Sequence, residues 1–559
     1  MQTSLRNWAG AAFAVAAIAG CGGGGDIELN PTTVDNSVSN TGSNDDANGN
    51  ADVCASYTTA SGQTRQGDFD GTHCRYGPTF VDAGNSLETD LTIPALPDDG
   101  AHIFEGSMFV GRAYDSDAEL ADAGIAQGGD GPTLTIEAGA TLAWESNDKF
   151  MVVNRGSRLM AVGTAAEPIT FTSVSDVNGD LADRPEAVSQ WGGIVINGFG
   201  VTNKCAYTGV RGDDLTLSGE CHVASEGSAG LDENYYGGDN DDDSSGRLEY
   251  VVVKHTGAEV GNGDELNGIT FGAVGRNTVV RNLETYATYD DGIEMFGGAV
   301  SFENYAGVYV RDDSIDIDEG WIGAIDTGLV VQSETDGNHC IEADGIGAYD
   351  DLDPAVVDDF IDRGLNSQPT ISKLTCIVSA NGADTATHDP GAGWRFREGI
   401  APVVNDSLVI ASFGPDAAAD ANYCLRIDNR SRELAQSGDV ILAPVVMACE
   451  DRTNGGSLPD GTSVEDWAAA QGVTFATVAG AVDPTPLSDT GLQLLEDVPP
   501  LFSLSFESMV VDDAGLDGAP RAGSFIGALS RSEDNPFASW TFGIFEDNRS
   551  VPLWIEAQR

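Results

Sequence analysis

Short apolar phrases recur along the middle of the chain, and glycine-containing turns separate them. Within residues 134–142, 150–159 and 169–173, apolar and polar side chains alternate with a period of two. Such alternation over a few residues is typical of β-strands, and no helical period of comparable length competes with it there. Short strands that recur about every 20 to 25 residues predict an all-β fold, a right-handed parallel β-helix or solenoid.

One phrase, of the form acid, acid, small residue, Ile, acid, occurs at residues 290–294 and again at 312–316, which is a spacing of 22 residues. A fixed period of this length indicates stacked repeats. If one copy lies on the other, about 4.8 Å away as in a β-sheet, six carboxylates form a ladder. Because like charges this close either raise one another's pKa or bind a counter-ion, we predict calcium between these coils; the alternative is a solvated acidic edge. The predicted ligands are Asp290, Asp291, Glu294, Asp312, Asp313 and Asp316.

Two further acidic clusters have the spacing of calcium-binding loops. In each of them, oxygen-bearing side chains at every second position can point at one ion. The second cluster lacks the bidentate Glu of an EF-hand, because Tyr250 stands at the twelfth position. The predicted ligands are Asp176, Asn178 and Asp180 in the first cluster and Asp239, Asp241 and Asp243 in the second.

The regular pattern also divides the chain. We predict a β-helix with inserted loops over residues 131–455. Because the open ends of a solenoid expose unpaired strand edges, residues 53–130 and 456–559 are predicted to form an N-terminal and a C-terminal cap. Within the second cap, Ser463 followed by acidic residues predicts the start of a short helix.

Composition agrees with an exported solenoid. The chain has 70 Gly among 559 residues, about twice the usual share, which fits many tight corners between short strands. The formal net charge of −62 repels nucleic acid, so we expect no nucleic-acid partner. Such a surface suits a medium outside the cell in which cations screen or bind it.

The first 21 residues indicate export. Arg6 is followed by a short run of small apolar residues that ends in Ile-Ala-Gly-Cys at residues 18–21, as in a secretory signal. The last four residues resemble a bacterial lipobox, which implies lipidation of Cys21; Gly rather than Asp follows it, which favours the outer membrane. Residues 22–52 are poor in large apolar side chains and are predicted to be a flexible tether. We therefore expect a lipid-anchored protein of the outer membrane, at the cell surface or facing the periplasm.

Eight cysteines remain when Cys21 is set aside. An even number in an exported chain indicates disulfides, and the alternative of a zinc site is weak because no Cys-x-x-Cys occurs. The spacing favours bonds between near neighbours, each stapling a local loop. The predicted pairs are Cys54–Cys74, Cys205–Cys221, Cys340–Cys376 and Cys424–Cys449.

The chain contains a set of phrases rich in Gly and aromatic residues: GTAAEPITFTS at 163–173, WGGIVING at 191–198, NGIT at 267–270, DDGIEMFGG at 290–298 and GWRFREG at 393–399. Together they resemble a widespread family of bacterial surface lipoproteins that belongs with the pectate-lyase-like right-handed β-helices. The resemblance covers roughly residues 130–400. It implies the fold and a location at the cell surface, and it assigns no activity.

Three functions follow as hypotheses. The first is a calcium-stabilised surface protein that binds or adheres to a glycan or a partner protein; the small number of Lys and Arg, 27 in the whole chain, favours it. The second is a polysaccharide lyase or glycoside hydrolase, in which calcium neutralises an acidic sugar and Arg, Lys or paired Asp residues act as base or acid. The third is an accessory lipoprotein of an outer-membrane transporter. The catalytic candidates are Asp290, Asp291, Asp312, Asp313, Arg281 and Arg311, with Lys254 as a further base.

Overall fold

The computed structural model describes residues 53–125, 130–225, 234–261, 264–333, 336–378, 391–411, 423–449, 451–476, 511–512, 525–529, 535–545 and 553. The predicted signal sequence, the lipidation site Cys21 and the tether at 22–52 lie outside these residues. No helix in the described part of the chain is long and apolar enough to cross a membrane.

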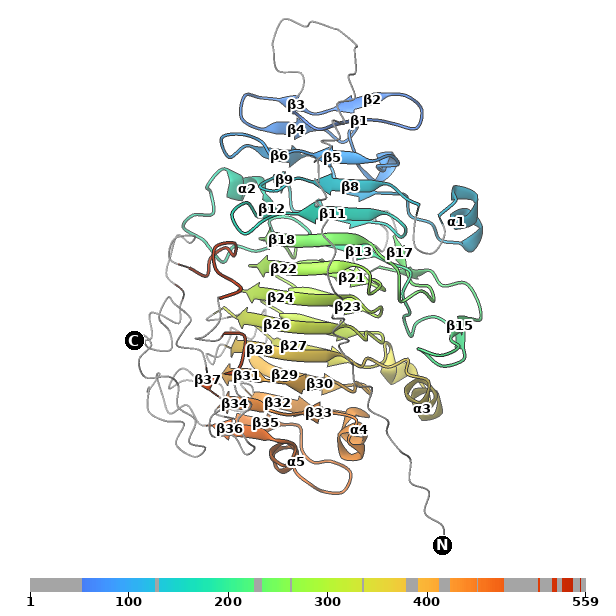
Figure 1. Ribbon diagram of the computed structural model, residues 1–559, viewed down its shortest axis with the longest axis vertical. Coiled ribbons are helices and arrows are strands. Elements are labelled where there is room, and N and C mark those ends of the chain that lie inside the picture. Colours follow the sequence, from blue (N-terminus) through green and yellow to red (C-terminus); the bar gives the residue numbers. More distant parts are fainter. Residues whose placement is uncertain are drawn as a thin grey trace, which may run out of the picture. The chain divides into compact units, whose positions relative to one another are not determined.

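Parallel strands stacked coil upon coil form the body of the described chain (Figure 1), which confirms the predicted all-β parallel β-helix. Ten strands make one sheet, here called the short sheet, in the order β35-β32-β29-β27-β25-β23-β21-β13-β10-β7. This order follows the chain, so each coil adds one strand. The strands are β7 (Met108–Val110), β10 (Met151–Val153), β13 (Ile194–Asn197), β21 (Ile269–Gly272), β23 (Ile293–Phe296), β25 (Ile315–Asp318), β27 (His339–Asp344), β29 (Ala392–Arg397), β32 (Tyr423–Ile427) and β35 (Asp451–Asn454).

Eighteen strands make the second sheet, here called the long sheet. Apart from the antiparallel pair β3–β4, its described pairings are parallel. The strands are β3 (Asp68–Phe69), β4 (Cys74–Tyr76), β5 (Leu91–Ile93), β6 (Ala101–Phe104), β8 (Thr133–Ile136), β9 (Thr141–Trp144), β11 (Arg158–Val162), β12 (Ile169–Ser173), β18 (Gly246–Lys254), β22 (Val279–Tyr286), β24 (Ser301–Val308), β26 (Ala324–Val331), β28 (Thr370–Val378), β30 (Val403–Asn405), β31 (Ser407–Ala411), β33 (Ile441–Leu442), β34 (Val445–Cys449) and β36 (Val473–Ala476).

The longest strands of this sheet turn a corner at one residue with a left-handed backbone. The φ angle is 52° at Asn282 and 60° at Asn304, and the paired register skips both residues. Asn tolerates this conformation better than most residues. The side chains also stack, because Asn304 Nδ2 donates to Asn282 Oδ1 over 2.9 Å. Each such coil therefore has three flat sides: one short-sheet strand and the two arms of a long-sheet strand.

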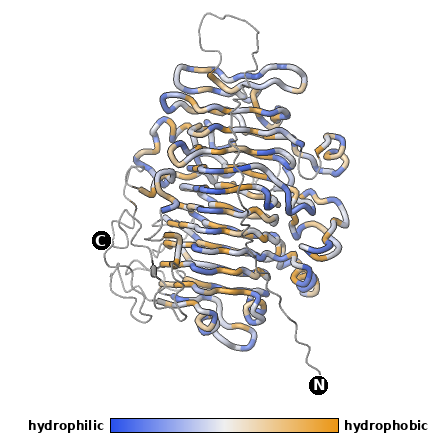
Figure 2. Tube along the Cα trace, viewed as in Figure 1, coloured by the Kyte–Doolittle hydropathy of each residue, from blue (hydrophilic) through white to orange (hydrophobic). Residues whose placement is uncertain are grey.

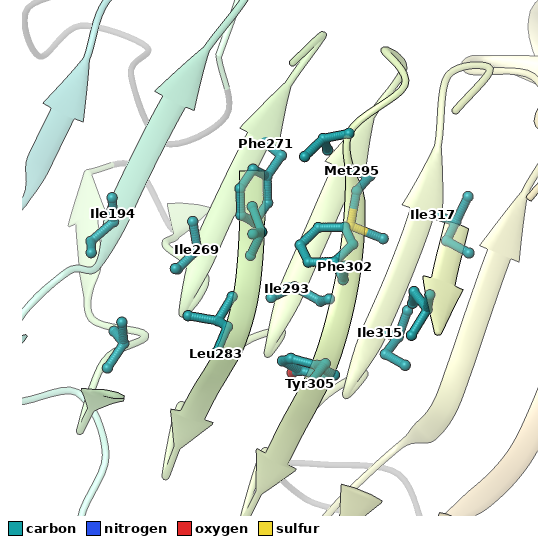
Figure 3. Packing of buried hydrophobic residues seen from close by; sticks show 14 of the residues in the cluster. Ile194, Ile269, Phe271, Leu283, Ile293, Met295, Phe302, Tyr305, Ile315 and Ile317 are labelled. Carbon is teal, nitrogen blue, oxygen red and sulfur yellow. The ribbon is translucent and has the colours of Figure 1, made fainter. Parts of the chain in front are cut away.

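Inward-facing apolar residues fill the coils and stack from one coil to the next. On the short sheet, Ile293 pairs with Ile269 on one side and Ile315 on the other, and all three are fully buried. They belong to the same core cluster as Leu283 and Tyr305 of the long sheet (Figure 3). Burying side chains of this size stabilises the fold by about 1.5–3 kcal/mol each. Along the coils, hydrophobic and hydrophilic positions alternate (Figure 2), as the sequence pattern predicts.

The β-helix begins before residue 131, where we predicted its start. Strands β5, β6 and β7 already pair in parallel with strands of the following coils. They are only three or four residues long, so their alternation is too brief to show in the sequence. The N-terminal cap is smaller than predicted and consists of the hairpin β1 (Ser56–Thr58) and β2 (Thr64–Gln66) with the antiparallel pair β3–β4.

The described residues of the predicted C-terminal cap, 456–559, lie in two different places on the β-helix. The predicted helix is α5 (Val464–Gln471), and Ser463 caps it by accepting a hydrogen bond from the backbone N of Asp466; it lies at the last described coils (Figure 1). The described residues 525–529 and 535–545, here called the strap, lie instead on the outer face of the long sheet, within an apolar cluster that includes Trp540 and Val308. This outer face is apolar, so it needs a cover, which explains why the strap does not lie at the end.

The remaining described elements lie in the connections between sheet strands, except β37 and β38, which follow the last sheet strand. The inserted loop that follows β13 contains four short strands, β14 to β17. The helices are η1 (Ala83–Asn85), α1 (Asp117–Ala123), α2 (Val174–Val177), η2 (Tyr349–Asp351), α3 (Pro354–Asp362) and α4 (Ser431–Ser437). The short antiparallel pairs are β14 (Tyr207–Thr208) with β15 (Thr216–Leu217), β16 (Val223–Ala224) with β17 (Tyr235–Tyr236), β19 (Glu259–Gly261) with β20 (Asp264–Glu265), and β37 (Val511–Asp512) with β38 (Phe525–Ile526).

All four predicted disulfides form, with Cα–Cα distances of 5.5 to 6.1 Å. Two of them are not surface staples. Cys340 of β27 and Cys376 of β28 are both fully buried, so their bond joins the short sheet to the long sheet inside the core. Cys424 of β32 and Cys449 of β34 do the same in a later coil.

The strap should contribute measurably to stability. Trp540 is 3% exposed and packs edge-on against Tyr250 at 6.0 Å between ring centroids. We expect Trp540→Ala to lower the free energy of unfolding by about 2–4 kcal/mol, the range for deleting a buried large side chain. Urea unfolding measures it, with Val356→Ala, at a residue 38% exposed, as the control. Equal unfolding curves for both variants would show that the strap does not stabilise the sheet.

Candidate metal centre on the short sheet

Outward-facing carboxylates stack in register on neighbouring coils of the short sheet. Glu294 of β23 pairs with Asp316 of β25, and Asp316 pairs with Glu342 of β27. In the next outward column, Phe296 pairs with Asp318. The predicted stacking of Glu294 over Asp316 is therefore present, and the column continues for one coil beyond the two phrases that the sequence repeats.

The turns before these strands hold the next coil by side-chain hydrogen bonds. Asn267 Oδ1 accepts from the backbone N of Asp291 over 3.1 Å, and Asp291 Oδ1 accepts from the backbone N of Asp313 over 2.9 Å. Asp313 Oδ1 in turn accepts from the backbone N of His339 over 2.6 Å. A short side chain with an acceptor oxygen is needed at this position in each coil, which gives Asn and Asp a structural role in the ladder.

Three groups of potential metal ligands occur among the described residues, each with ligand atoms within 4.8 Å of one another. Two of the groups contain carboxylates only, and Asp291 belongs to both. The third contains a histidine. The groups are Asp290, Asp291 and Asp312; Asp291, Glu294 and Asp316; and Asp313, His339 and Glu342.

Arginines neutralise the third group and the coils beyond it. Arg395 Nη1 lies 2.8 Å from Glu342 Oε1, and Arg397 Nη2 lies 2.8 Å from Glu342 Oε2. Asp344 and Asp428 are paired in the same way, Asp344 with Arg397 at 2.5 Å and Asp428 with Arg395 at 3.3 Å. Because two guanidinium groups already hold Glu342, a metal ion there would meet like charge. The third group is therefore a poor cation site.

Asp291 and Asp316, one of them in both carboxylate groups and the other in one, differ from Glu342 in this respect. In the part of the chain that the structure describes, no Lys or Arg nitrogen lies within 4.0 Å of a carboxylate oxygen of Asp291 or Asp316. Asp291 is 7% exposed and Glu294 is 6% exposed. Asp316 Oδ1 is buried and has no hydrogen-bond partner. Buried carboxylate oxygens in this condition are costly unless a proton or a cation compensates them.

The pKa shifts of Asp291 and Asp316 agree with the need for a compensating proton or cation. Burial raises the pKa of Asp291 well above its ordinary value, and the charges of Asp316 and Asp290 raise it further. Burial likewise raises the pKa of Asp316, with the charges of Asp313 and Glu342 adding to it. Without a cation, these carboxyls therefore retain protons that carboxyls in water would lose.

The donor set fits calcium. Every ligand atom offered by the two groups is a carboxylate oxygen, and calcium prefers about six to eight oxygen ligands from mono- or bidentate carboxylates and carbonyls. Asp291, shared by both groups, can contribute to either. Five of the six predicted ladder ligands fall in these two groups; the sixth, Asp313, faces His339 instead, with Oδ1 2.9 Å from Nδ1.

His339 and Tyr423 extend the site beyond the sequence prediction. The second ring nitrogen of His339, Nε2, lies 2.7 Å from the hydroxyl of Tyr423, and burial lowers the pKa of His339 to about 4, so the ring is neutral at neutral pH. Residues 338–342, Asn-His-Cys-Ile-Glu, stand where the repeated acidic phrase would recur. The spacing there is 26 residues rather than 22 and the first two acids are replaced, which is why the repeat is not recognisable in the sequence.

The predicted loop site at Asp176, Asn178 and Asp180 is not assembled. Asp176 lies in α2, and its Oδ2 accepts from Thr172 over 2.7 Å and pairs with Lys254 Nζ at 2.6 Å. Asn178 is the C-terminal cap of the same helix. The Asp176 carboxylate is therefore already neutralised by a lysine, which removes the reason to bind calcium.

The second predicted loop is not assembled around one point either. Its three carboxylates point at different partners: Asp239 accepts from the backbone N of Leu217 over 3.2 Å, and Asp243 accepts from the backbone N of Phe199 over 3.0 Å. Asp241 forms two hydrogen bonds of 2.8 Å with the guanidinium of Arg211. These acids pin the inserted loop to the β-helix.

The basic catalytic candidates face other partners. Arg281 lies on the outer face of the long sheet, half-exposed, and pairs with Glu303 at 2.9 Å. Arg311 precedes Asp312, yet its Nη2 donates to the backbone oxygen of Glu186 over 3.0 Å. Arginines that do lie on the outer face of the short sheet are Arg395, Arg397 and Arg426.

A family model described as a pectate-lyase like beta helix domain matches residues 116–473, more than half of the chain. The chain belongs to this family. The matched range contains both carboxylate groups and the arginine-neutralised coils of this pectate-lyase-like β-helix protein. No curated protein and no solved structure matches the chain. Family membership accounts for the fold, and function has to be argued from the site.

Stability at the arginine end of the array should depend on pH through Glu398. Burial raises its pKa to about 7 from an ordinary value of 4.5, the charge of Asp344 adds to the rise, and Arg397 opposes it. The stabilisation by the neutral carboxyl is therefore complete below about pH 4.5 and is lost as the pH rises through about 7. We expect Glu398→Gln to unfold like the parent in acid and to be more stable by about 1–3 kcal/mol above pH 7, after allowance for solvent screening.

Urea unfolding at acid and alkaline pH measures this difference. Glu433→Gln, at an exposed position of α4, serves as the control and should follow the parent throughout. A Glu398→Gln profile parallel to that of the parent would show that the carboxyl is ionised normally in the folded protein.

Proposed function

We propose that this pectate-lyase-like β-helix protein is a calcium-stabilised lipoprotein of the outer membrane whose flank binds a glycan or a partner protein. Calcium binding is proposed because two parts of the stacked carboxylates on the short sheet differ in their counter-charges. Where the short-sheet column continues through Glu342, arginines neutralise it; at Asp291 and Asp316 the described residues supply no Lys or Arg partner. A bound divalent cation would fill that role.

The lipoprotein part rests on the sequence. The Ile-Ala-Gly-Cys phrase at residues 18–21 and the resemblance to surface lipoproteins support lipidation at Cys21. Four disulfides in the described chain support a compartment outside the reducing cytoplasm. The net charge of −62 supports a partner that is neutral, cationic or bridged by calcium, since an anionic partner would otherwise be repelled.

One observation favours a second function, a polysaccharide lyase. Arg395 and Arg397 lie two coils from Asp316 on the same outer face, and the hydrogen-bonded pair of His339 and Tyr423 lies among them. Calcium on the carboxylates, guanidinium groups for a sugar acid and a tyrosine hydroxyl are the groups that a β-elimination needs. The ion pairs that already hold both arginines weigh against it, because a substrate would have to compete with Glu342.

Calcium should stabilise the folded protein. A ligand bound only to the native state adds RT ln(1 + [L]/Kd), about 2.7 kcal/mol when free calcium is about 100 times Kd. We therefore expect chelator to lower the melting temperature by several degrees, and excess calcium to restore it. The double variant Asp291→Asn with Asp316→Asn should lose this response, because it removes a ligand from both groups.

The matched control is Glu303→Gln with Asp326→Asn. These two acids also stack in register, on the outer face of the long sheet, where their side chains are 51% and 58% exposed. The control should keep the full calcium response. If the parent melts at the same temperature in calcium and in chelator, the carboxylate groups hold no structural calcium.

A polysaccharide panel separates the two functions. The lipid-free protein, with calcium, is incubated with acidic and neutral polymers, and both ultraviolet absorbance of unsaturated products and new reducing ends are followed. We expect retention of a polymer or protein partner without product. Unsaturated product that disappears in Arg395→Ala would make the protein a lyase and contradict the binding function.

A further inference from the structure

A buried lysine and a buried carboxylate are in contact beneath the strap. Neither residue belongs to the two carboxylate groups on the short sheet. Lys254, the last residue of β18, places its Nζ 2.6 Å from Oδ2 of Asp176. The two side chains are only 9% and 19% exposed. Asp176 belongs to the loop that leaves the sheet after β12, and Lys254 belongs to the strand that pairs with β12. The contact thus joins the loop to the next coil.

A buried histidine, a buried acid and an aromatic ring complete the surroundings. His255 Nε2 lies 3.7 Å from Oδ1 of Asp176. Glu284 lies opposite Val252 in the register of β18 and β22, on the same face as Lys254 and one position away diagonally. It is wholly buried; Oε2 accepts from the backbone N of Phe542 in the strap over 2.6 Å, whereas Oε1 has no partner. The ring of Phe542 lies 3.9 Å from Lys254 Nζ and shields the amine from water.

This arrangement is hard to explain as a stabilising ion pair. Buried ion pairs commonly contribute less stability than apolar residues of the same volume, and a wholly buried glutamate with an unpartnered oxygen costs further free energy. A lysine amine, a carboxyl group and a second acid, held together in a shielded site, are however the reactants and the proton carrier for amide formation. We propose that Lys254 and Asp176 become joined by an intramolecular amide bond, an isopeptide crosslink, with Glu284 as the proton carrier.

The reaction needs no oxidant or cofactor. A proton passes from the ammonium of Lys254, by way of Glu284, to Asp176. Burial raises the pKa of Asp176, but the hydrogen bond from His255 and the charge of Lys254 hold it below its ordinary value, so this transfer is the uphill part of the reaction. The lone pair of Nζ attacks Cγ of Asp176. Nζ lies 2.6 Å from Oδ2, in contact with the carboxylate that it must attack, and a near-attack arrangement needs about 3–3.5 Å between Nζ and Cγ. The hydroxyl of Thr172, which donates to Oδ2 over 2.7 Å, stabilises the oxygen as charge develops on it. The bond from Cγ to the other oxygen, Oδ1, then breaks. Oδ1 leaves as water with two of the three protons of the Lys254 ammonium, the third stays on the amide nitrogen, and Oδ2 becomes the amide oxygen.

The crosslink would close a loop of 78 residues (254 − 176 = 78) and would tie the loop that follows β12 to the body of the β-helix. Unlike the four disulfides, it would persist in reducing conditions. Its formation depends on the strap, because Phe542 supplies both the cover over the amine and the hydrogen bond that fixes Glu284. The order of events is therefore folding of the coils, docking of the strap and then bond formation.

Peptide mapping of the purified, folded chain by mass spectrometry tests the proposal. Trypsin does not cut after an acylated lysine, so the crosslink predicts one branched product in which residues 159–204 are attached to residues 248–276, lighter by one water than the two separate peptides. The pair Lys149 and Asp148, also 2.6 Å apart but with an aspartate side chain 60% exposed, should remain unlinked. Complete cleavage after Lys254 in natively folded protein would overturn the proposal.

Two variants separate the crosslink from a merely structural contact. Lys254→Arg keeps a positive charge beside Asp176 but cannot form the amide under these conditions, so the branched peptide should vanish while circular dichroism stays native. Glu284→Gln keeps an oxygen that accepts from Phe542 but carries no proton to transfer, so bond formation should slow about a hundredfold. Undiminished crosslinking in Glu284→Gln would overturn the role given to Glu284.

Discussion

On the outer face of the short sheet, carboxylates stack in register, and their negative charge must be neutralised. The structure of this face depends on that constraint. A parallel β-helix repeats the same side-chain position about every 4.8 Å from coil to coil. An acidic residue that recurs with the period of the coil therefore lies next to the equivalent acidic residue of the following coil. At Glu342 and Asp428 arginines meet this constraint. At Asp291 and Asp316 none does in the described chain, and a cation or retained protons must take that part.

The sequence was sufficient for the fold because the fold is periodic. Alternating short strands, glycine turns and a 22-residue repeat each follow from the stacking of coils, and near-neighbour cysteines pair because consecutive coils are in contact. The limits of the β-helix could not be predicted equally well. Strands β5 to β7 are too short to show a period, and the strap covers an outer face whose apolar residues look like core residues in the sequence.

The site was predictable only where the repeat is strict. Asp290, Asp291, Glu294, Asp312 and Asp316 recur at the period of the coil, and the structure brings them together. His339 and Glu342 could not be predicted as part of the array, because a longer turn changes the spacing from 22 to 26 residues. In the two predicted loop clusters, Asp176 pairs with Lys254 and Asp241 pairs with Arg211. Sequence spacing does not reveal these partners, because they come from distant parts of the chain. A charge cluster is a site only after its counter-charges are known.

The central claim, that the carboxylates around Asp291 and Asp316 require a cation, is tested most directly by isothermal titration of the chelator-treated protein with calcium. Performed in buffers of different ionisation enthalpy, the titration reports both calcium bound and protons released. The account predicts saturable binding accompanied by net proton release, since carboxyls with raised pKa give up protons to the ion. Absence of binding by natively folded protein at neutral pH, or binding with no proton release, would contradict it.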